Sequence, residues 1–337
     1  MKIFCFGELL LRISPAANGE WIKQASLPVF VGGAELNVAT ALASWNQEVG
    51  YMTALPDNTL TTDIKNYIQS KNIDSSPIHI SGNRIGTYYL TQGADLKSVG
   101  VIYDRAYSSF SELKPGIINW EEVLKGYQWF HFSAISPALN QQVADLCEEA
   151  LIAASKLGLK ISVDLNYRSR LWKYGKAPVE IMPKLAAYCD LIMGNIWSAA
   201  ELLGTSIDAD IHQNASKEKY LSHATKTSVE IMSKFPKCEM VANTFRFDEA
   251  DGLKYYASLN NKNGQWVSKQ FFTNSVVDKI GSGDCFMGGL IYSSVNKQSH
   301  QDTINFAAAA AFGKLQEMGD ATTQTVAAVL ENLKHGE

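Results

Sequence analysis

The chain has 337 residues, of which 46% are hydrophobic, and carries a formal net charge of −4 at pH 7. A chain of this length and apolarity can bury a sizeable core, in one large domain or two modest ones. Acidic and basic residues are mixed and no Lys/Arg-rich run occurs, so neither a nucleic acid nor a membrane surface is expected as a partner.

Short apolar runs alternate with helical patterns along the chain. Apolar runs predict strands at residues 2–9, 48–55, 128–136, 160–166, 190–195 and 238–245. Apolar residues at helical spacing predict helices at 34–46, 61–72, 140–158 and 303–319, the last two ending at Gly158 and Gly319. Because strands buried on both faces form continuous apolar runs, this alternation favours a parallel sheet with helices on both sides.

Two segments break the alternation. Residues 86–110 are rich in aromatic and β-branched side chains, contain a Gly turn and have no helical period, which predicts a β-hairpin. Residues 21–33 have a similar composition. We therefore expect a small β-rich part inserted between early units of the α/β domain.

The cysteines indicate a reducing compartment. Their number is odd and no two form a Cys-x-x-Cys pair: Cys5, Cys147, Cys189, Cys238 and Cys285. Buried free thiols are expected rather than disulfides or a metal site. The N-terminal residues 1–14 include a Glu and lack a cleavage pattern, so they are interpreted as a buried strand, not a signal peptide. With no bilayer-spanning stretch, the protein is expected to be soluble and cytoplasmic.

The segment 276–292, VVDKIGSGDCFMGGLIY, places glycines, a hydroxyl and a carboxylate at the start of a predicted helix. Glycines permit a tight turn, and a helix N-terminus offers unpaired N–H groups and a partial positive charge. Gly281, Ser282 and Gly283 are therefore candidates for an anion cradle, most simply for a phosphoryl group. Asp284 could accept a proton from a hydroxyl that attacks phosphorus. The alternative is an ordinary turn with Asp284 as N-cap.

A second pair of glycines precedes the helix predicted at 34–46. In VGGAELNVATALA, residues 31–43, Gly32 and Gly33 could let the backbone approach a ligand, and Asn37 lies one turn into the helix. An amide offers both a donor and an acceptor, which suits sugar hydroxyls. A plain loop followed by a capping or internally satisfied Asn is the alternative.

The motifs GGAELNVA and DKIGSGDCFMGG, in this order and at this separation, resemble the two signatures of the PfkB (ribokinase-like) carbohydrate kinases. The resemblance spans nearly the whole chain. It implies an α/β, ribokinase-like fold, that is, a Rossmann-like three-layer α/β/α sheet with a small β-sheet lid over the sugar. The nucleotide-binding domain would comprise residues 1–11, 34–85 and 112–337, and the lid residues 12–33 and 86–111. Related kinases often pair through the lid, which implies a homodimer.

The family also implies ATP and Mg2+ as cofactors and gives roles to individual residues. Asp284 becomes the catalytic base, and Gly281, Ser282 and Gly283 form the anion hole. Asp278 matches a family position near a monovalent-cation site, which makes K+ a further candidate cofactor.

The nucleotide side departs from the family pattern. Relatives carry a Glu three residues after the Asn of an N-x-x-E segment, whereas here Asn195 is followed at that place by Ser198, and Glu201 comes three residues later. The resemblance assigns Asn195 to the nucleotide and lets Glu201 contact Mg2+ through water in place of the missing Glu. Thr244 and Arg246 match family residues near the ATP phosphates.

Arginines near the predicted hairpin and strand ends suit an anionic sugar. Tyr103 and Arg105 are two residues apart, so on a strand they lie on one face, and Arg168 follows the strand predicted at 160–166. Ligands of parallel α/β sheets gather beyond the C-terminal strand ends, and guanidinium groups pair with carboxylates in a two-pronged geometry. Alternatively, both arginines are solvated or held in structural ion pairs.

The surrounding segments resemble the 2-keto-3-deoxygluconate (KDG) kinase branch of the family: GTYYL, VIYDRAYSSF, HFSAISPAL, DLNYRSRLW and GNIWSAAELLG. The resemblance implies a keto-acid site lined by Gly33, Tyr88, Tyr103, Arg105 and Arg168, with the arginines on the carboxylate. The expected reaction transfers the γ-phosphoryl of ATP to the terminal hydroxyl of KDG, giving 2-keto-3-deoxy-6-phosphogluconate.

Three other functions stay open. A kinase for a neutral sugar, fructokinase-like or ribokinase-like, would share the motifs but would not need the two arginines. A catalytically silent sugar-nucleotide sensor would share the fold, although the intact GSGD segment disfavours it. A dinucleotide-dependent dehydrogenase would need glycine at Phe286 to complete G-x-G-x-x-G, and no G-x-x-x-x-G-K-[ST] motif occurs.

Overall fold

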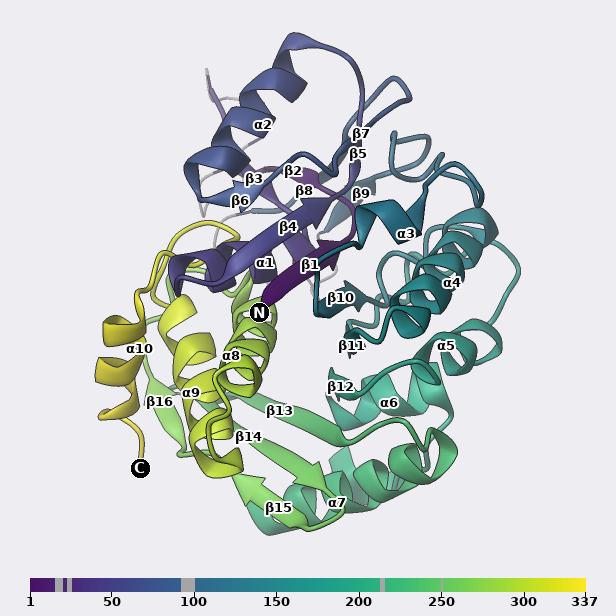
Figure 1. The fold of residues 1–337 in the computed structure, drawn as a ribbon. Helices are drawn as coiled ribbons and strands as arrows, with labels where there is room; N and C mark the ends of the chain where they lie inside the picture. Colours follow the sequence, from purple (N-terminus) through teal and green to yellow (C-terminus); the bar gives the residue numbers. More distant parts are fainter. Residues whose placement is uncertain (16–20, 23–25, 92–100, 213–215, 250) are drawn as a thin grey trace.

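A central sheet of ten strands runs through the computed structural model, which describes residues 1–15, 21–22, 26–91, 101–212, 216–249 and 251–337 (Figure 1). Nine of the strands form one continuous path, and the tenth, β16 (Phe271–Thr273), pairs with β14 off that path. In spatial order the path is β15 (Gly264–Val267), β14 (Gly252–Asn261), β13 (Met240–Glu249), β12 (Leu191–Gly194), β11 (Lys160–Asp164), β10 (Trp129–Ser133), β1 (Lys2–Phe6), β4 (Glu48–Met52) and β6 (Ile73–Asp74).

The sheet is parallel from β6 to β13 and antiparallel at its other edge. The parallel strands β10 and β12 are buried along their whole length, as the apolar runs WFHFS and LIMG predict. The expectation of a parallel sheet is confirmed there and wrong for β14, β15 and β16. Because β13 ends at Glu249 and β14 begins at Gly252, the connection is too short for the crossover that parallel strands require.

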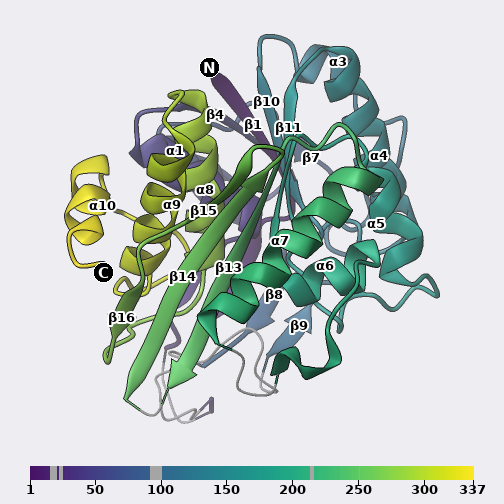
Figure 2. The same ribbon diagram turned by 90° about the horizontal axis from the view of Figure 1, so that it is seen from below.

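Helices cover both faces of the sheet, so the predicted three layers are confirmed (Figure 2). One face packs against α1 (Ala34–Ser44), α2 (Thr59–Ser70), α8 (Ser282–Val295), α9 (His300–Lys314) and α10 (Val326–Leu333). The other carries α3 (Trp120–Val123), α4 (Gln141–Lys156), α5 (Pro178–Ala186), α6 (Ile196–Leu203) and α7 (Lys217–Lys234), and a 3-10 turn, Ala209–His212, precedes α7. Each face buries its own apolar core, which holds the strand ends rigidly in place.

Helices α8 and α9 lie in close contact. A Cβ at Gly289 would come within 2.6 Å of the Cα of Ala307, and Ala307 to Ala311 are fully buried. The helix expected at 303–319 ends at Lys314 instead, because the chain then turns back over α8. Gly319 lies in that turn with a φ of 95°, and Gly158 follows α4 with a φ of 76°, as expected of a residue beyond a helix end.

A second, four-stranded sheet has the order β3 (Val29–Gly32), β2 (Leu10–Ile13), β8 (Gly86–Tyr89) and β9 (Ile102–Asp104). The antiparallel pairing of β8 with β9 confirms the predicted hairpin, whose residues 92–100 lie outside the described part of the chain. In the predicted 21–33 stretch only β3 is a strand, and it pairs with β2; residues 23–25 are likewise not described.

The strand expected at 48–55 is divided between two sheets. β4 ends at Met52, and β5 (Ala54–Leu55) pairs with β7 (His79–Ile80) in a separate two-stranded ladder. Thr53 lies at the bend and accepts a hydrogen bond from the N–H of Leu9 through its hydroxyl (3.1 Å). Apolar content alone gave no sign of this change of partner.

Two further expectations concern burial. All five cysteines are free and buried, as predicted. Among the helices of the described residues, none is long and apolar enough to cross a membrane.

Candidate active site

A cleft of about 1350 Å3, including its open mouth, lies where the carboxyl ends of the parallel strands meet the second sheet. Open α/β sheets bind their ligands at this edge. Most site residues expected from the sequence line it: Gly33, Asn37, Tyr88, Tyr103, Arg105, Arg168, Asn195, Thr244, Arg246, Gly281, Ser282, Gly283 and Asp284. Gly32, Asp278 and Glu201 are not among the lining residues.

The predicted anion loop forms the N-terminus of α8. Gly281 is the N-cap with a φ of 77°, and a Cβ there would lie 1.7 Å from the carbonyl oxygen of Asp320, so only glycine fits. The first helical hydrogen bond runs from the N–H of Cys285 to the carbonyl of Gly281 (2.8 Å). The N–H groups of Ser282 and Gly283 precede that ladder, which makes them available to an anion in the cleft.

Asp284 projects from the first turn of α8 and is 8% exposed. Burial raises the pKa of its carboxyl to about 6, although the amide of Asn37 and the charge of Arg168 act in the opposite direction. A carboxyl with this pKa is mostly ionised at pH 7 and still basic enough to accept a proton. Its position beside the anion loop suits a general base.

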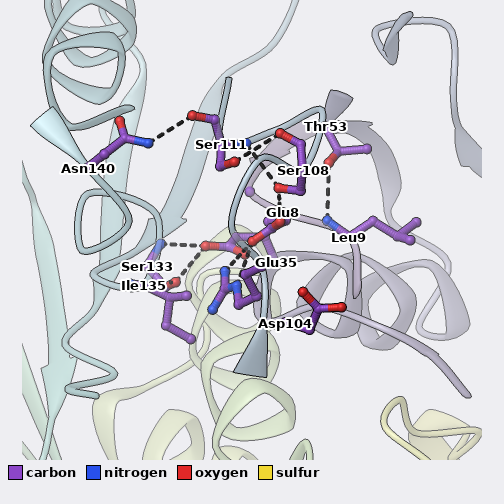
Figure 3. A network of polar contacts seen from close by, with 12 residues as sticks. Glu8, Leu9, Glu35, Thr53, Asp104, Ser108, Ser111, Ser133, Ile135 and Asn140 are labelled. Atoms are coloured by element: carbon purple, nitrogen blue, oxygen red, sulfur yellow. Dashed lines mark hydrogen bonds and ion pairs between the residues drawn. The ribbon is translucent and has the colours of Figure 1, made fainter. Parts of the chain in front are cut away.

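The amide of Asn37 points at this base. Its Nδ2 donates a 2.7 Å hydrogen bond to Oδ2 of Asp284, while its Oδ1 is buried without a hydrogen-bond partner within the described structure. The first turn of α1 is anchored by Glu35, whose Oε1 accepts from the N–H (2.9 Å) and hydroxyl (2.6 Å) of Ser133 at the end of β10 (Figure 3). The sugar contact of Asn37 stays a prediction, and the structure adds a contact from this amide to Asp284.

The two glycines before α1 permit close backbone approaches. Gly33 has a φ of 129°, and a Cβ there would lie 2.3 Å from the carbonyl oxygen of Glu8. A Cβ at Gly32 would lie 2.2 Å from Oδ2 of Asp320. Gly33 borders the cleft, whereas Gly32 supports the wall behind it.

Arg105 lines the cleft in an ion pair with Glu8, an arrangement left open by the sequence analysis, which did not identify the partner. Its Nε lies 2.6 Å and its Nη2 2.5 Å from Oε2 of Glu8, and both side chains are at most 5% exposed. The hydroxyl of Ser108 donates to Oε1 of Glu8 (2.5 Å) (Figure 3). Glu8 therefore fixes the plane of the guanidinium. The signal for Glu8 was its place just after the first strand, at the ligand-binding end of the sheet.

Arg168 faces the cleft from the loop after β11 and donates to the carbonyl of Tyr167 (3.3 Å). Asp164, at the end of the same strand, is 6% exposed and also lines the cleft. Burial raises the pKa of the Asp164 carboxyl, and the neighbouring Asp284 raises it further, whereas Arg168 lowers it. Arg168 was identified as a site residue from the sequence, but Asp164 was not.

Tyr88 and Tyr103 form the wall contributed by the second sheet. Their ring centroids are 6.4 Å apart, and the hydroxyl of Tyr88 donates to Oδ2 of Asp320 (2.6 Å). Asp320 also lies 2.8 Å from Nε of Arg12, an ion pair that is almost fully buried. The tyrosine wall is thus tied to the turn behind the anion loop.

The nucleotide-side residues are only partly brought together. Thr244 and Arg246 lie two apart on β13 and both line the cleft. Asn195 also lines it, but its Oδ1 accepts from the N–H of Ser198 (2.8 Å) as the N-cap of α6. Glu201 is exposed on α6, and its carboxylate contributes to a raised pKa of Tyr167, after the larger effect of burial.

Asp278 lies beneath the anion loop and is fully buried. Its Oδ2 lies 2.7 Å from Nη2 of Arg12 and accepts from the N–H of Gly319 (3.2 Å), and its Oδ1 accepts from the N–H of Ile280 (3.1 Å). Both carboxylate oxygens therefore already have partners from the protein.

Comparison with known proteins decides the family. The model of the pfkB family carbohydrate kinases matches residues 1–233 and 250–326. This chain belongs to that family. Its ribokinase-like fold and its activity as an ATP-dependent carbohydrate phosphotransferase, both expected from the glycine motifs, are thereby confirmed.

Similar PfkB kinases act on sugar acids. A 2-dehydro-3-deoxygalactonokinase from Haloferax volcanii is 26% identical over 338 residues, covering 100% of this chain and 98% of that enzyme. The crystal structure of 2-dehydro-3-deoxygluconokinase from Thermotoga maritima has a TM-score of 0.89 at 32% identity and covers 99% of both chains. A fructokinase with bound ATP from Xylella fastidiosa, with a TM-score of 0.76 at 18% identity over 99% and 98% of the chains, shares the fold alone.

The residues of this PfkB kinase fit ATP. No atom lies within 4 Å of the place that a Cβ at Gly283 would take, so the anion loop is open to a phosphate. In the part of the chain that the structure describes, no three His, Cys, Asp or Glu residues are grouped to hold a metal ion. Mg2+ would therefore be held chiefly by the phosphates of ATP and by water, as is usual for this ion.

Proposed function

We propose that this PfkB kinase transfers the γ-phosphoryl group of ATP to the terminal hydroxyl of KDG, giving 2-keto-3-deoxy-6-phosphogluconate. KDG is the substrate that the name 2-dehydro-3-deoxygluconokinase gives to the relative from Thermotoga maritima. The observation that carries the proposal is the pair Arg105 and Arg168, which line the same cleft as the base Asp284. Guanidinium groups in a largely buried cleft favour a substrate that brings a carboxylate.

In the proposed reaction Asp284 acts as the general base. Its carboxylate takes the proton of the terminal hydroxyl as the hydroxyl oxygen bonds to the γ-phosphorus, and the bond from that phosphorus to the bridging oxygen of ADP breaks. The N–H groups of Ser282 and Gly283, with Gly281 shaping the turn, stabilise the charge on the transferring group. Mg2+, when bound with ATP, would supply positive charge to the phosphate oxygens.

Asn37 orients the base through its 2.7 Å hydrogen bond. Tyr88 and Tyr103, with Gly33, shape the sugar side of the cleft, and Gly32 supports it from behind. Asn195, Thr244 and Arg246 would serve the nucleotide side. Glu201 would reach Mg2+ through water, whereas both oxygens of Asp278, the family position for K+, are already engaged by protein groups.

The proposal extends to the assembly of the protein. The second sheet would act as the lid over the sugar, with residues 12–33 and 86–111 as its segments, and the exposed side chains of Val29 and Ile102 on it would support a homodimer. Five free thiols suit work in the cytoplasm.

A second candidate is a kinase for a neutral sugar. The observation in its favour is that Glu8 already neutralises Arg105. A substrate carboxylate near Arg105 would therefore have to share the guanidinium with Glu8, which weakens the case for an acid compared with a free arginine.

A substrate comparison tests the proposal. Purified protein with ATP and Mg2+ is assayed for ADP release on KDG, its galacto epimer, gluconate, fructose and ribose. The expected result is a kcat/KM for one of the two keto acids at least about 100-fold above that for either neutral sugar, as two charge-assisted contacts provide. A higher kcat/KM for fructose or ribose would contradict the proposal and favour the second candidate.

A further inference from the structure

A fully buried lysine lies behind the anion loop. Lys314 is the last residue of α9, and its side chain has no exposed surface. Its Nζ donates to the carbonyl of Glu317 (3.0 Å), which closes the turn after the helix. Its Cε lies 3.5 Å from the place that a Cβ at Gly281 would take, directly behind the N-cap of α8.

This lysine belongs to a cluster of charged side chains that are buried from water. The carboxyls of Asp278 and Asp320 are buried beside it, and Arg12 is paired with both, at 2.7 Å and 2.8 Å. Burial lowers the pKa of Lys314, and the opposing effect of the carboxylates, with Asp278 first, offsets this only in part. Removing a charge from water costs several kcal/mol, so a buried lysine needs such partners to remain ionised.

The cluster does not suit a bound monovalent cation. Such an ion needs several oxygen atoms free to coordinate it. Here both oxygens of Asp278 are engaged by Arg12 and by the N–H groups of Gly319 and Ile280, and the carbonyl of Glu317 accepts from Lys314. A K+ ion at the family position of Asp278 would therefore meet the guanidinium of Arg12 on that carboxylate, and the charge of Lys314 acts on the same cluster.

Lys314 lies where its positive charge can act on groups in the cleft. Lys314 packs against the turn at Gly281, which lines the cleft, and its charge acts on Asp284, whose carboxyl pKa it lowers. A fixed positive charge behind an anion hole stabilises the negative charge that gathers on the transferring phosphoryl group, and it needs no reorganisation during the reaction.

We propose that the ammonium group of Lys314 is the built-in cation of the anion loop, taking the place of a bound monovalent cation, so that this kinase works without K+. The inference rests on the proposed phosphoryl transfer at this loop, but not on the identity of the sugar. It can therefore be tested with whichever sugar supports turnover, and its failure is distinct from failure of the KDG assignment.

The first experiment compares cations on the intact enzyme. Turnover is measured at constant ionic strength in KCl, NaCl and tetramethylammonium chloride, with saturating Mg2+ and ATP. The expected rates agree within about 2-fold. A stimulation by K+ of 10-fold or more over tetramethylammonium would overturn the proposal.

The second experiment removes the charge. Lys314→Ala is expected to lower kcat at least 10-fold in tetramethylammonium chloride and to gain a dependence on K+ or NH4+ that the wild type lacks, because the vacated space borders the carbonyl of Glu317 and lies in the negative field of Asp278 and Asp320. A purely structural lysine would not produce this gain. Lys269→Ala is the matched control, since Lys269 also donates to a carbonyl, that of Gly336 (2.8 Å), outside the cleft.

Two readouts do not depend on activity. ADP affinity of Lys314→Ala, measured by calorimetry, should fall and be partly restored by KCl, and its melting temperature should rise with KCl while that of the wild type does not. A folded variant with normal kcat and no response to K+ would refute the proposal. If the variant does not fold, the cation comparison on the wild type still decides.

Discussion

The hydrogen bond from Asn37 to Asp284 is expected to set the lower pH limit of activity if Asp284 is the proposed base. The donor stabilises the ionised carboxylate, so it lowers a pKa that burial has raised, and the result is a value of about 6. Activity that requires the ionised base should therefore fall as the pH drops through about 6, with kcat/KM decreasing about 10-fold for each pH unit below it.

Replacing Asn37 with Leu removes the donor and keeps the number and branching of the side-chain heavy atoms. A hydrogen bond to a charged group contributes about 1.5–3 kcal/mol, and one pKa unit corresponds to about 1.36 kcal/mol. The acidic limb of the pH profile should consequently move up by about 1 to 2 pH units. At pH 7 the variant should lose about 2- to 10-fold in kcat/KM and recover most of it by pH 9.

The assay is kcat/KM for the preferred sugar between pH 5 and pH 9.5, because this ratio reports the pKa of the free enzyme. Asn58→Ala is the control, since Asn58 caps α2 through the N–H of Thr61 (3.0 Å), outside the cleft. It should change stability without moving the limb. An acidic limb of Asn37→Leu within about 0.3 pH unit of the wild type would refute the reasoning.

Three more outcomes test the site. Asp284→Asn should lower kcat at least about 100-fold. The same variant should have a free energy of unfolding at pH 7 that is higher by up to ~3 kcal/mol, because a carboxyl with a pKa of about 6 in the folded protein makes ionisation above pH 4 unfavourable to folding. Urea titrations should show that this gain in stability disappears below pH 4. Arg105→Ala and Arg168→Ala should each cost about 1.5–3 kcal/mol in kcat/KM for a keto acid and far less for fructose, and equal losses on both sugars would remove the carboxylate assignment. Gly281→Ala should prevent stable folding, because the added Cβ would collide with the carbonyl of Asp320. Gly283→Ala should leave the melting temperature unchanged and weaken ATP binding measured by calorimetry. An unchanged ATP affinity of Gly283→Ala would exclude the loop as a phosphate site.

The sequence was most informative where one residue type alone can serve. Gly281, with its positive φ and its contact with the carbonyl of Asp320, could be recognised from the GSGD motif because no other residue fits. The parallel strands and the layers of helices were equally predictable, since their apolar periodicity reflects burial on one or two faces.

Pairings across long chain separations were not predictable. Arg105 was recognised as a cleft residue, but its partner Glu8 is 97 residues away and carries no local signal of the contact. Asp278 was assigned by position alone, while its actual neighbour, Arg12, is 266 residues away on the second sheet. The antiparallel pairing at the edge of the main sheet was also not predicted, because apolar runs encode burial and not strand direction.

The buried contacts of Arg12 also govern how the molecule can open. Arg12 on β2 is paired with Asp278 and Asp320 without access to water, and losing one of these partners costs about 3–5 kcal/mol, so a conformation with a broken pair is populated to less than about 1%. The strand β2 is therefore expected to stay attached to the main sheet. If the second sheet moves when a sugar enters, the displacement should be larger at the far edge strand β9, whose Ile102 is 57% exposed, than at β2.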